Sequence, residues 1–255
     1  MPSKEQEVYE EMLTALLDVC LQQNIRPKPE RVMADFEKAI QNAARSTLNH
    51  DGNLHVQGCF YHLTQSTWRR VQSEGLQNDY HNSEAVKEFC GKIDGLAFLP
   101  ECDVKEGIAI LYDEVPDNLR CLVEYFDATY VNGPLRAVEV AGSVNLRFRR
   151  LPPMYPPVLW NVHQATLQDR DRTNNQCESW NNAFKYLVGC ANPSLWHVIY
   201  CLNEDAILSA TDIIRCERGV LTKKRVKRGT TIHKQKLKRL CNQYSKQEKN
   251  PTTIS

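Results

Sequence analysis

The sequence contains no long hydrophobic run. No stretch approaches the roughly 18 uninterrupted apolar residues that a membrane-spanning helix needs, and the mean hydropathy of the 255 residues is -0.51. The first seven residues, MPSKEQE, contain no apolar signal core. We therefore expect neither a membrane partner nor a secreted protein.

Cysteine is sparse, with 10 residues in 255, and no two of them form a C-x-x-C pair. This content is below that of a disulfide-stapled domain, so we expect a reducing compartment and mostly buried thiols. The sequence also has no internal repeat and no glycine-rich phosphate loop. We expect no structural zinc, because Cys59 and His62 form a single C-x-x-H pair, which is half of a zinc site.

Charge of both signs is abundant but unevenly distributed. Lys and Arg number 32 against 31 Asp and Glu, giving a formal net charge of +1. From Arg215 to the end there are 13 basic and two acidic residues, so the rest of the chain has 19 basic and 29 acidic residues. The body is therefore acidic and the tail strongly basic.

The clustered cations of the basic tail are typical of a segment that binds nucleic acid. Clustered cations bind the phosphate backbone or serve as a nuclear import signal, whereas the alternative is a solvated helical surface that only keeps a protein soluble. Leu237, Leu240 and Tyr244 recur at helical spacing, so part of the tail is also expected to dock as an amphipathic helix. The residues predicted to bind nucleic acid are Lys223, Lys224, Arg225, Lys227, Arg228, Lys234, Lys236, Lys238 and Arg239.

Hydrophobic periodicity predicts alternating helices and strands early in the chain and helices alone afterwards. We expect helices over 5–23, 36–47 and 61–72 and strands over 31–34 and 54–59, an order typical of α/β construction. Later helices are expected over 83–99, 103–114 and 116–125. Two more follow, one that comes after 170–175 and ends at 188, and one over 194–215. Between them, 132–158 is rich in Gly and Pro and is predicted to be a long loop.

Three segments carry residues suited to chemistry: VMADFEKA at 32–39, QGCFYHLTQ at 57–65 and RTNNQCESWN at 172–181. They resemble three segments of the Mutator-like element (MULE) transposase family, namely strand-Asp-Phe-Glu-x-Ala, G-C-x-x-H-x-x-Q and T-N-N-x-x-E-x-x-N. The segments occur in the order of the family, and the resemblance extends from about residue 4 to about residue 245.

The resemblance implies a fold of the class α/β plus α. This is a partial ribonuclease-H-like fold that lacks its first strands and has an all-helical insertion and a basic C-terminal tail. It assigns the partial ribonuclease-H-like core to 1–75, the helical insertion and irregular loop to 76–170, the helices that complete the catalytic core to 171–214 and the basic tail to 215–255.

By the same resemblance, Asp35 and Glu178 are the second and third carboxylates of a DDE nuclease site and the ligands of Mg²⁺ or Mn²⁺. Cleavage and transfer of a DNA strand use two divalent cations about 4 Å apart, and such hard cations prefer carboxylate oxygens. Taken by themselves, however, an Asp after a strand is commonly a helix N-cap and a single helical Glu is commonly solvated.

Five further residues are associated with this site: Cys59, His62, Asn174, Asn175 and Asn181. The resemblance puts Cys59 and His62 near the catalytic face, whereas the residues alone favour a packed histidine, since Leu63 and Trp68 lie on the apolar face of the same helix. Asn174 and either Asn181 or Asn182 share a helix face with Glu178 by the i, i+3 and i+4 rule. Together with Asn175 they would support the Glu-bearing helix or contact the nucleic acid.

The first carboxylate of the family site has no counterpart in this chain. In family order it lies on a D-G-T/S strand that precedes the helix at 5–23, and Asp18 lies within that helix. We therefore expect that the chain alone does not cleave or join DNA.

Together these features predict a MULE transposase-derived nuclear protein that binds DNA in a role related to DNA transposition. The alternative is a domesticated, non-enzymatic factor that binds nucleic acid or protein. A homo-oligomer is left open by the sequence.

Overall fold

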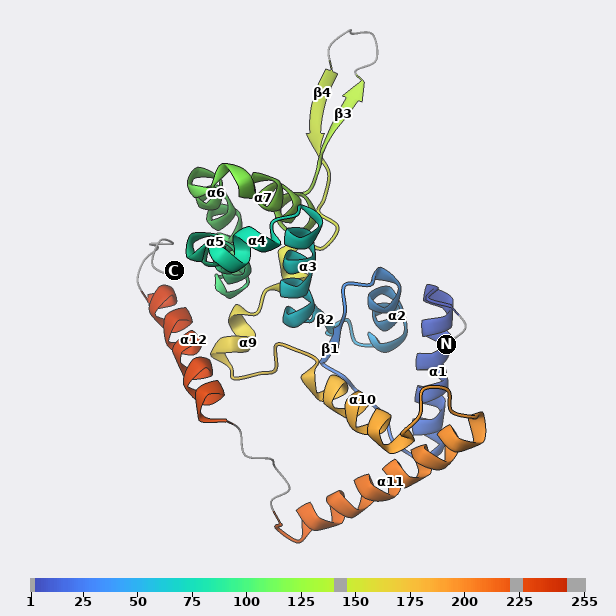
Figure 1. Ribbon diagram of the computed structural model, residues 1–255. Helices are drawn as coiled ribbons and strands as arrows, with labels where there is room; N and C mark the ends of the chain where they lie inside the picture. Colours follow the sequence, from blue (N-terminus) through green and yellow to red (C-terminus); the bar gives the residue numbers. More distant parts are fainter. Residues whose placement is uncertain (1–2, 140–145, 221–226, 247–255) are drawn as a thin grey trace. The chain divides into compact units, whose positions relative to one another are not determined.

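The computed structural model describes residues 3–139, 146–220 and 227–246 (Figure 1). The chain divides into two compact units. Unit 1 comprises Met1–Thr173 and Leu237–Ser255, and unit 2 comprises Asn174–Lys236. Each unit is described by itself below. Within the described ranges, no helix combines the length and the apolar character that crossing a membrane requires.

Unit 1 begins with two helices and a pair of parallel strands. Helix α1 (Gln6–Gln22) packs along α2 (Lys38–Leu48), whose buried face includes Ala43 and Ala44. Strand β1 (Arg31–Ala34) pairs in parallel with β2 (His55–Gly58), so the carboxyl ends of the two strands lie at the same edge.

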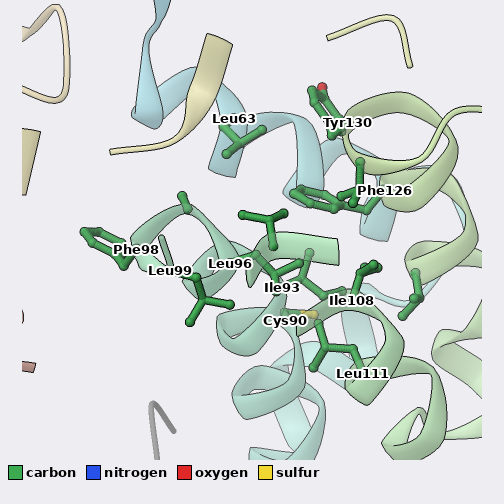
Figure 2. Close-up of a cluster of buried hydrophobic side chains, with 14 of the residues drawn as sticks. Leu63, Cys90, Ile93, Leu96, Phe98, Leu99, Ile108, Leu111, Phe126 and Tyr130 are labelled. Carbon is green, nitrogen blue, oxygen red and sulfur yellow. The ribbon is translucent and has the colours of Figure 1, made fainter. Parts of the chain in front are cut away.

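The hydrophobic core of unit 1 lies mainly among helices. These are α3 (Phe60–Ser73), α5 (Glu84–Gly95), α6 (Val104–Glu114) and α7 (Arg120–Phe126), with the short α4 (Gln77–Asn82) between α3 and α5. Figure 2 shows side chains from these helices, among them Leu63, Ile93, Ile108 and Phe126, gathered in one cluster. All four are at most 1% exposed.

Short helical turns join the core helices. Three are 3-10 turns, η1 (Leu96–Phe98), η2 (Glu101–Asp103) and η3 (Asp117–Leu119), and the π-helical turn η4 (Asp127–Val131) continues α7.

An antiparallel hairpin and two short helices complete the first part of unit 1. The hairpin pairs β3 (Leu135–Glu139) with β4 (Leu146–Arg150) and projects away from α6 and α7 (Figure 1). Helices α8 (Pro157–Trp160) and α9 (His163–Leu167) follow. The Trp160 indole is fully buried, and its N–H donates to the carbonyls of Tyr130 and Tyr155, both at 3.0 Å.

Unit 2 consists of the helices α10 (Asn175–Val188) and α11 (Leu195–Glu217) with the chain that follows them. Gly189 ends α10 in the left-handed region at φ +67, and Ser194 caps α11 by accepting from the backbone N–H of His197. Helix α12 (Arg228–Lys246) then leads back into unit 1 from Leu237 onward.

The predicted partial ribonuclease-H-like fold, of the class α/β plus α, is wrong. In the described part of the chain, strands form two separate sheets of two strands each, and most residues are helical. A central sheet would need further strands beside β1 and β2, which are only four residues long. The large apolar side chains that would cover such a sheet are buried instead between α3, α5, α6 and α7.

The long loop predicted over 132–158 is also wrong in part. Residues 135–139 and 146–150 form the hairpin, and 157–160 form α8.

Candidate functional site

Three of the predicted site residues come together at the carboxyl edge of the β1–β2 pair. Asp35 follows β1 and Cys59 follows β2, where the backbone N–H of Cys59 donates to the carbonyl of Ala34 at 2.9 Å. Cys59 is fully buried at the start of α3. One turn later, Nδ1 of His62 lies 3.0 Å from Oδ1 of Asp35.

The Asp35–His62 contact lies partly in solvent. The Asp35 side chain is 53% exposed and that of His62 is 22% exposed. Nδ1 of His62 is buried and has no hydrogen bond of good geometry within the described residues, so the contact with Asp35 is close without being well directed. A divalent cation approaching Oδ1 of Asp35 would therefore compete with the His62 side chain for space. In the described ranges, no group of three or more His, Cys, Asp and Glu side chains is arranged to hold a metal ion.

The two residues after Asp35 have structural roles. The Phe36 ring packs edge-on against Tyr130 and Tyr155, with centroids 5.6 and 5.1 Å away, and the Tyr155 hydroxyl donates to the Phe36 carbonyl at 2.7 Å. A Cβ at Gly58 would lie 2.7 Å from Cζ of Phe36, which explains glycine at the end of β2.

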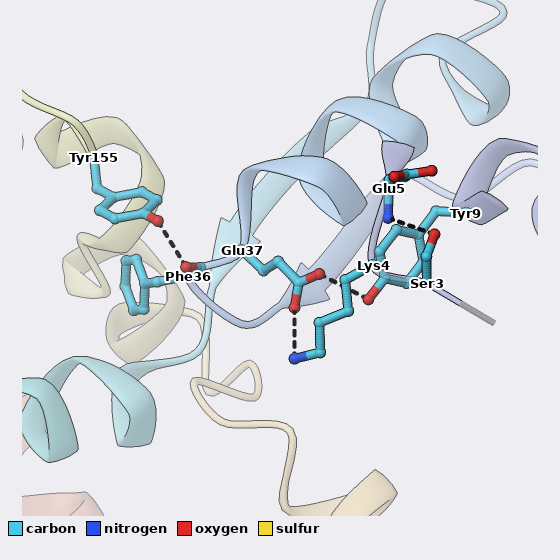
Figure 3. A network of polar contacts seen from close by, with 7 residues as sticks. All are labelled: Ser3, Lys4, Glu5, Tyr9, Phe36, Glu37 and Tyr155. Carbon is cyan, nitrogen blue, oxygen red and sulfur yellow. Dashed lines mark hydrogen bonds and ion pairs between the residues drawn. The ribbon is translucent and has the colours of Figure 1, made fainter. Parts of the chain in front are cut away.

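Glu37 joins α1 to this segment (Figure 3). Its carboxylate accepts from the Tyr9 hydroxyl at 2.8 Å and lies 3.5 Å from Nζ of Lys4. The hydrogen bond to Glu37 and burial together raise the pKa of Tyr9. Thus the Asp-Phe-Glu segment fixes β1 between α1 and the aromatic cluster.

The other residues of the predicted catalytic site lie in unit 2. Asn174 occupies the N-cap position of α10, and its carbonyl accepts from the backbone N–H of Glu178 at 3.1 Å. Glu178 is half-buried in the first turn, whereas Asn175 and Asn181 are exposed. Because Asp35 belongs to unit 1 and Glu178 to unit 2, their joint binding of Mg²⁺ or Mn²⁺ stays a prediction.

Helix α12 is amphipathic, as the spacing of Leu237, Leu240 and Tyr244 predicts. Leu237 and Leu240 are half-buried, while Cys241 and Tyr244 are buried and belong to the core of unit 1. The Tyr244 hydroxyl donates to Asp103 at 3.2 Å. Burial, reinforced by the Asp103 charge, raises the pKa of Tyr244 to about 12.

The polar residues of α12 reinforce this docking. The Cys241 thiol points to the Phe98 carbonyl at 3.6 Å, and Ser245 lies 3.3 Å from Nε2 of His163. Lys238 forms an ion pair with Asp169.

The cations of α12 lie mostly on its exposed side. Arg228, Arg239 and Lys246 are separated by 11 and 7 residues, or about three and two helical turns, and so lie on one line opposite Leu237 and Tyr244. The exposed cations predicted to bind nucleic acid are Lys227, Arg228, Lys234, Lys236 and Arg239. The predicted Lys223, Lys224 and Arg225 lie outside the described residues.

The β3–β4 hairpin is a second cationic element, and the sequence analysis missed it. Arg136 and Arg149 are directly opposite each other in the register, and both are exposed. Two like charges at opposed positions destabilise a hairpin, so this pair lowers the intrinsic stability of the β3–β4 hairpin. The alternation of LRFRR at 146–150 has a period of two and could have indicated a strand.

The base of this hairpin is held by a buried carboxylate. Nη1 of Arg150 lies 3.3 Å from Asp127 and donates to the Gly133 carbonyl at 3.2 Å. Asp127 also accepts from Asn132 at 2.6 Å and from the Tyr112 hydroxyl at 3.3 Å. Burial and the Asp127 charge raise the pKa of Tyr112 to about 12.

Gly133 is required at the hairpin base. Its φ is +84, and a Cβ there would lie 1.9 Å from the Leu151 carbonyl oxygen.

Comparison of the chain with protein-family models, with curated proteins and with solved structures finds no match in any of the three.

Proposed function

We propose that this protein binds DNA in the nucleus through the exposed cations of α12, assisted by the arginines of the β3–β4 hairpin. Its role in this proposal is binding related to DNA transposition, without strand cleavage by this chain alone.

The observation that carries the proposal is the division of α12 into two faces. Leu237, Cys241 and Tyr244 fix one face to the core of unit 1, and Arg228 and Arg239 lie on the other. A helix anchored in this way presents its cations at fixed spacing, which suits a phosphate backbone better than a freely solvated tail would. The excess of cations in this part of the sequence supports the same partner.

The relation to MULE transposases remains part of the proposal and rests on the three sequence segments, without a ribonuclease-H-like fold. The contact of Asp35 with His62 supports a binding role, because a metal ion at Oδ1 of Asp35 would have to displace the His62 side chain. The same contact favours the second candidate, a domesticated factor that uses DNA binding alone.

DNA binding is tested by fluorescence anisotropy with a labelled duplex and the full chain. Changing Arg228, Lys234, Lys236 and Arg239 to Gln is expected to lower affinity by about 100-fold at low salt, because each lost phosphate contact reduces counterion release. The slope of log K against log salt should fall in magnitude by about 3 to 4. Arg136→Gln with Arg149→Gln should give a smaller loss, of about 10-fold.

The matched control changes the same number of exposed cations elsewhere: Arg69, Lys105, Arg120 and Lys185. Equal losses in the two four-site variants would contradict a role specific to α12. Nicking of plasmid DNA by the purified chain with Mg²⁺ or Mn²⁺, abolished by Asp35→Ala, would contradict binding without cleavage.

A further inference from the structure

Unit 1 contains a pocket of about 450 Å³ between α3, α4 and α5. This volume lies within the range of small-ligand sites. The pocket is separate from Asp35 and from the cations of α12, and its lining combines aromatic rings with one carboxylate, that of Asp94.

Helical spacing explains how the pocket forms. Thr64, Trp68 and Val71 line it from α3 at steps of four and three residues, and Lys87, Gly91 and Asp94 line it from α5 at the same steps. A Cβ built at Gly91 meets no atom within 4 Å, so the absence of a side chain there leaves space open.

Aromatic rings form a corner in the wall of the pocket. The Trp68 ring lies 4.8 Å from that of Tyr80 at an interplanar angle of 62°, and 5.9 Å from that of His81 at 73°. Rings at such angles do not form the parallel slot that a flat nucleobase would enter. A compact cation, by contrast, is attracted to the electron-rich face of Trp or Tyr wherever it can approach within about 6 Å.

The carboxylate adds negative charge to the same wall. Oδ1 of Asp94 is buried and has no hydrogen-bond partner in the described part of the chain. Burial raises the pKa of Asp94 to about 6, and the Thr67 hydroxyl limits this rise, so the group is mainly ionised at pH 7.5. The lining of the pocket also includes Lys87. Its Nζ lies 3.3 Å from the carboxylate of Glu84, so its charge is paired with that residue.

We propose that this pocket binds an alkylammonium group, with Trp68 and Tyr80 facing the cation and Asp94 compensating its charge. The group can belong to a small quaternary or primary amine or to a lysine side chain of a peptide, methylated or not. Both sources present the same chemistry, a compact ammonium cation at the end of an alkyl chain.

The test is isothermal titration of the full chain with choline and with its neutral isostere 3,3-dimethyl-1-butanol. Choline is expected to bind with a dissociation constant below about 10 mM, and the isostere at least 10-fold more weakly. A short peptide containing trimethyl-lysine, compared with the same peptide containing norleucine, distinguishes the two sources. Peptide binding at least 10-fold tighter than choline assigns the site to lysine side chains, and equal or weaker binding assigns it to small amines.

Three variants test the assignment of residues. Asp94→Asn and Trp68→Leu should each weaken choline binding at least 10-fold, and Gly91→Leu should abolish it by filling the pocket. Gly91→Leu is expected to fold, since its Cβ meets open space and leucine favours a helix more than glycine does. Glu88→Gln, at an exposed position of α5 outside the pocket, is the control and should bind choline as the unchanged chain does.

Equal binding of choline and its isostere, no binding of either, or full choline binding by Gly91→Leu would each overturn the proposal. Because none of the variants changes a cation of α12, DNA binding by Gly91→Leu should be unchanged. The two proposals can thus fail separately.

Discussion

The helices of unit 1 and of unit 2 have similar amphipathic sequences but differ in what their apolar faces contact. In unit 1, apolar side chains of α3, α5, α6 and α7 are buried against one another. In unit 2, Trp196, Tyr200, Ile207 and Ile213 of α11 are all more than half exposed, and Cys201 is the one buried residue among those described. Amphipathic spacing therefore predicts that a helix forms, but not what it packs against.

The contacts within unit 2 are few and partly polar. The rings of Trp180 and Phe184 stack on α10 with centroids 5.2 Å apart, and the Trp180 indole donates to Asp205 of α11 at 2.9 Å. Nε2 of His197 lies 3.0 Å from the Val188 carbonyl. Because little apolar surface is buried between α10 and α11, we expect this pair to open at a lower free energy than the core of unit 1.

The largest expected difference between the units comes from truncating an isoleucine in each. Ile93→Ala should lower the free energy of unfolding by about 2–5 kcal/mol, because the fully buried side chain leaves a cavity. Ile207→Ala, at a side chain 61% exposed, should change it by less than about 0.5 kcal/mol. Urea unfolding followed by circular dichroism measures both. A comparable loss for Ile207→Ala would mean that the face of α11 is buried in solution.

The second prediction concerns pH. The raised pKa of Asp94, about 6 against an ordinary 3.8, means that the folded state binds the proton more tightly than the unfolded state. Stability should therefore fall as pH rises from about 4 to about 6, by about 2–3 kcal/mol at most. Asp94→Asn should remove this dependence and be the more stable protein at pH 7.5.

Thermal unfolding between pH 4 and 8 tests this linkage. The other titratable groups that line the pocket are Tyr61, Tyr80, His81, Lys87 and Cys90. Asp212→Asn, at an exposed site in unit 2, is the control and should keep the pH profile of the unchanged chain. An identical profile for Asp94→Asn would refute the assignment to Asp94.

A glycine in each unit gives a third comparison. Gly58→Ala should destabilise unit 1 by about 1–3 kcal/mol, because the new Cβ would lie 2.7 Å from the Phe36 ring. Gly189→Ala should lower the free energy of unfolding by about 1 kcal/mol, from its positive φ alone. The atom nearest to the new Cβ would be the Tyr186 carbonyl oxygen at 3.9 Å, so no close contact adds to this loss. The denaturant midpoints of the two variants, each compared with that of the unchanged chain, measure the two losses of stability. A larger effect at Gly189 would show that the turn of unit 2 is the more constrained.

The last comparison concerns one helix cap in each unit, where both effects are expected to be small. Ser83 caps α5 by accepting from Val86 at 3.4 Å, and Ser194 caps α11 by accepting from His197 at 3.3 Å. Replacing either by Ala should cost about 1 kcal/mol. Amide hydrogen exchange should register the Ser83 change throughout unit 1 and the Ser194 change only in α11. Loss of protection in unit 1 on Ser194→Ala would contradict independent opening.

Much of the local structure could be predicted from the sequence, because periodicity and capping act over short distances. The expected strand at 31–34 and the helices at 5–23 and 61–72 agree with the structure to within one residue at each end. The sheet could not be predicted in the same way. Two strand patterns do not reveal whether further strands pair beside them. The larger sheet was expected from the resemblance alone, and the structure has a helical core in unit 1 instead.

The candidate site shows the same limit. The resemblance put Cys59 and His62 near the face of Asp35, and the parallel pairing of β1 with β2, which brings the three residues together, was not predicted. The opposed Arg136 and Arg149 were missed because the glycines and prolines around them predicted a loop. Asp94 could not be found from the sequence, since its character depends on burial between helices that local spacing does not position.

The docking of α12 makes the order of synthesis important for this chain. Tyr244 bonds to Asp103 and Cys241 to the carbonyl of Phe98, across sequence separations of 141 and 143 residues. Unit 2 is thus inserted between two segments that fold together. A ribosome must release all of α10 and α11 before α12 reaches its place, so the Phe98–Asp103 surface of the nascent unit 1 stays uncovered until α12 has been synthesised.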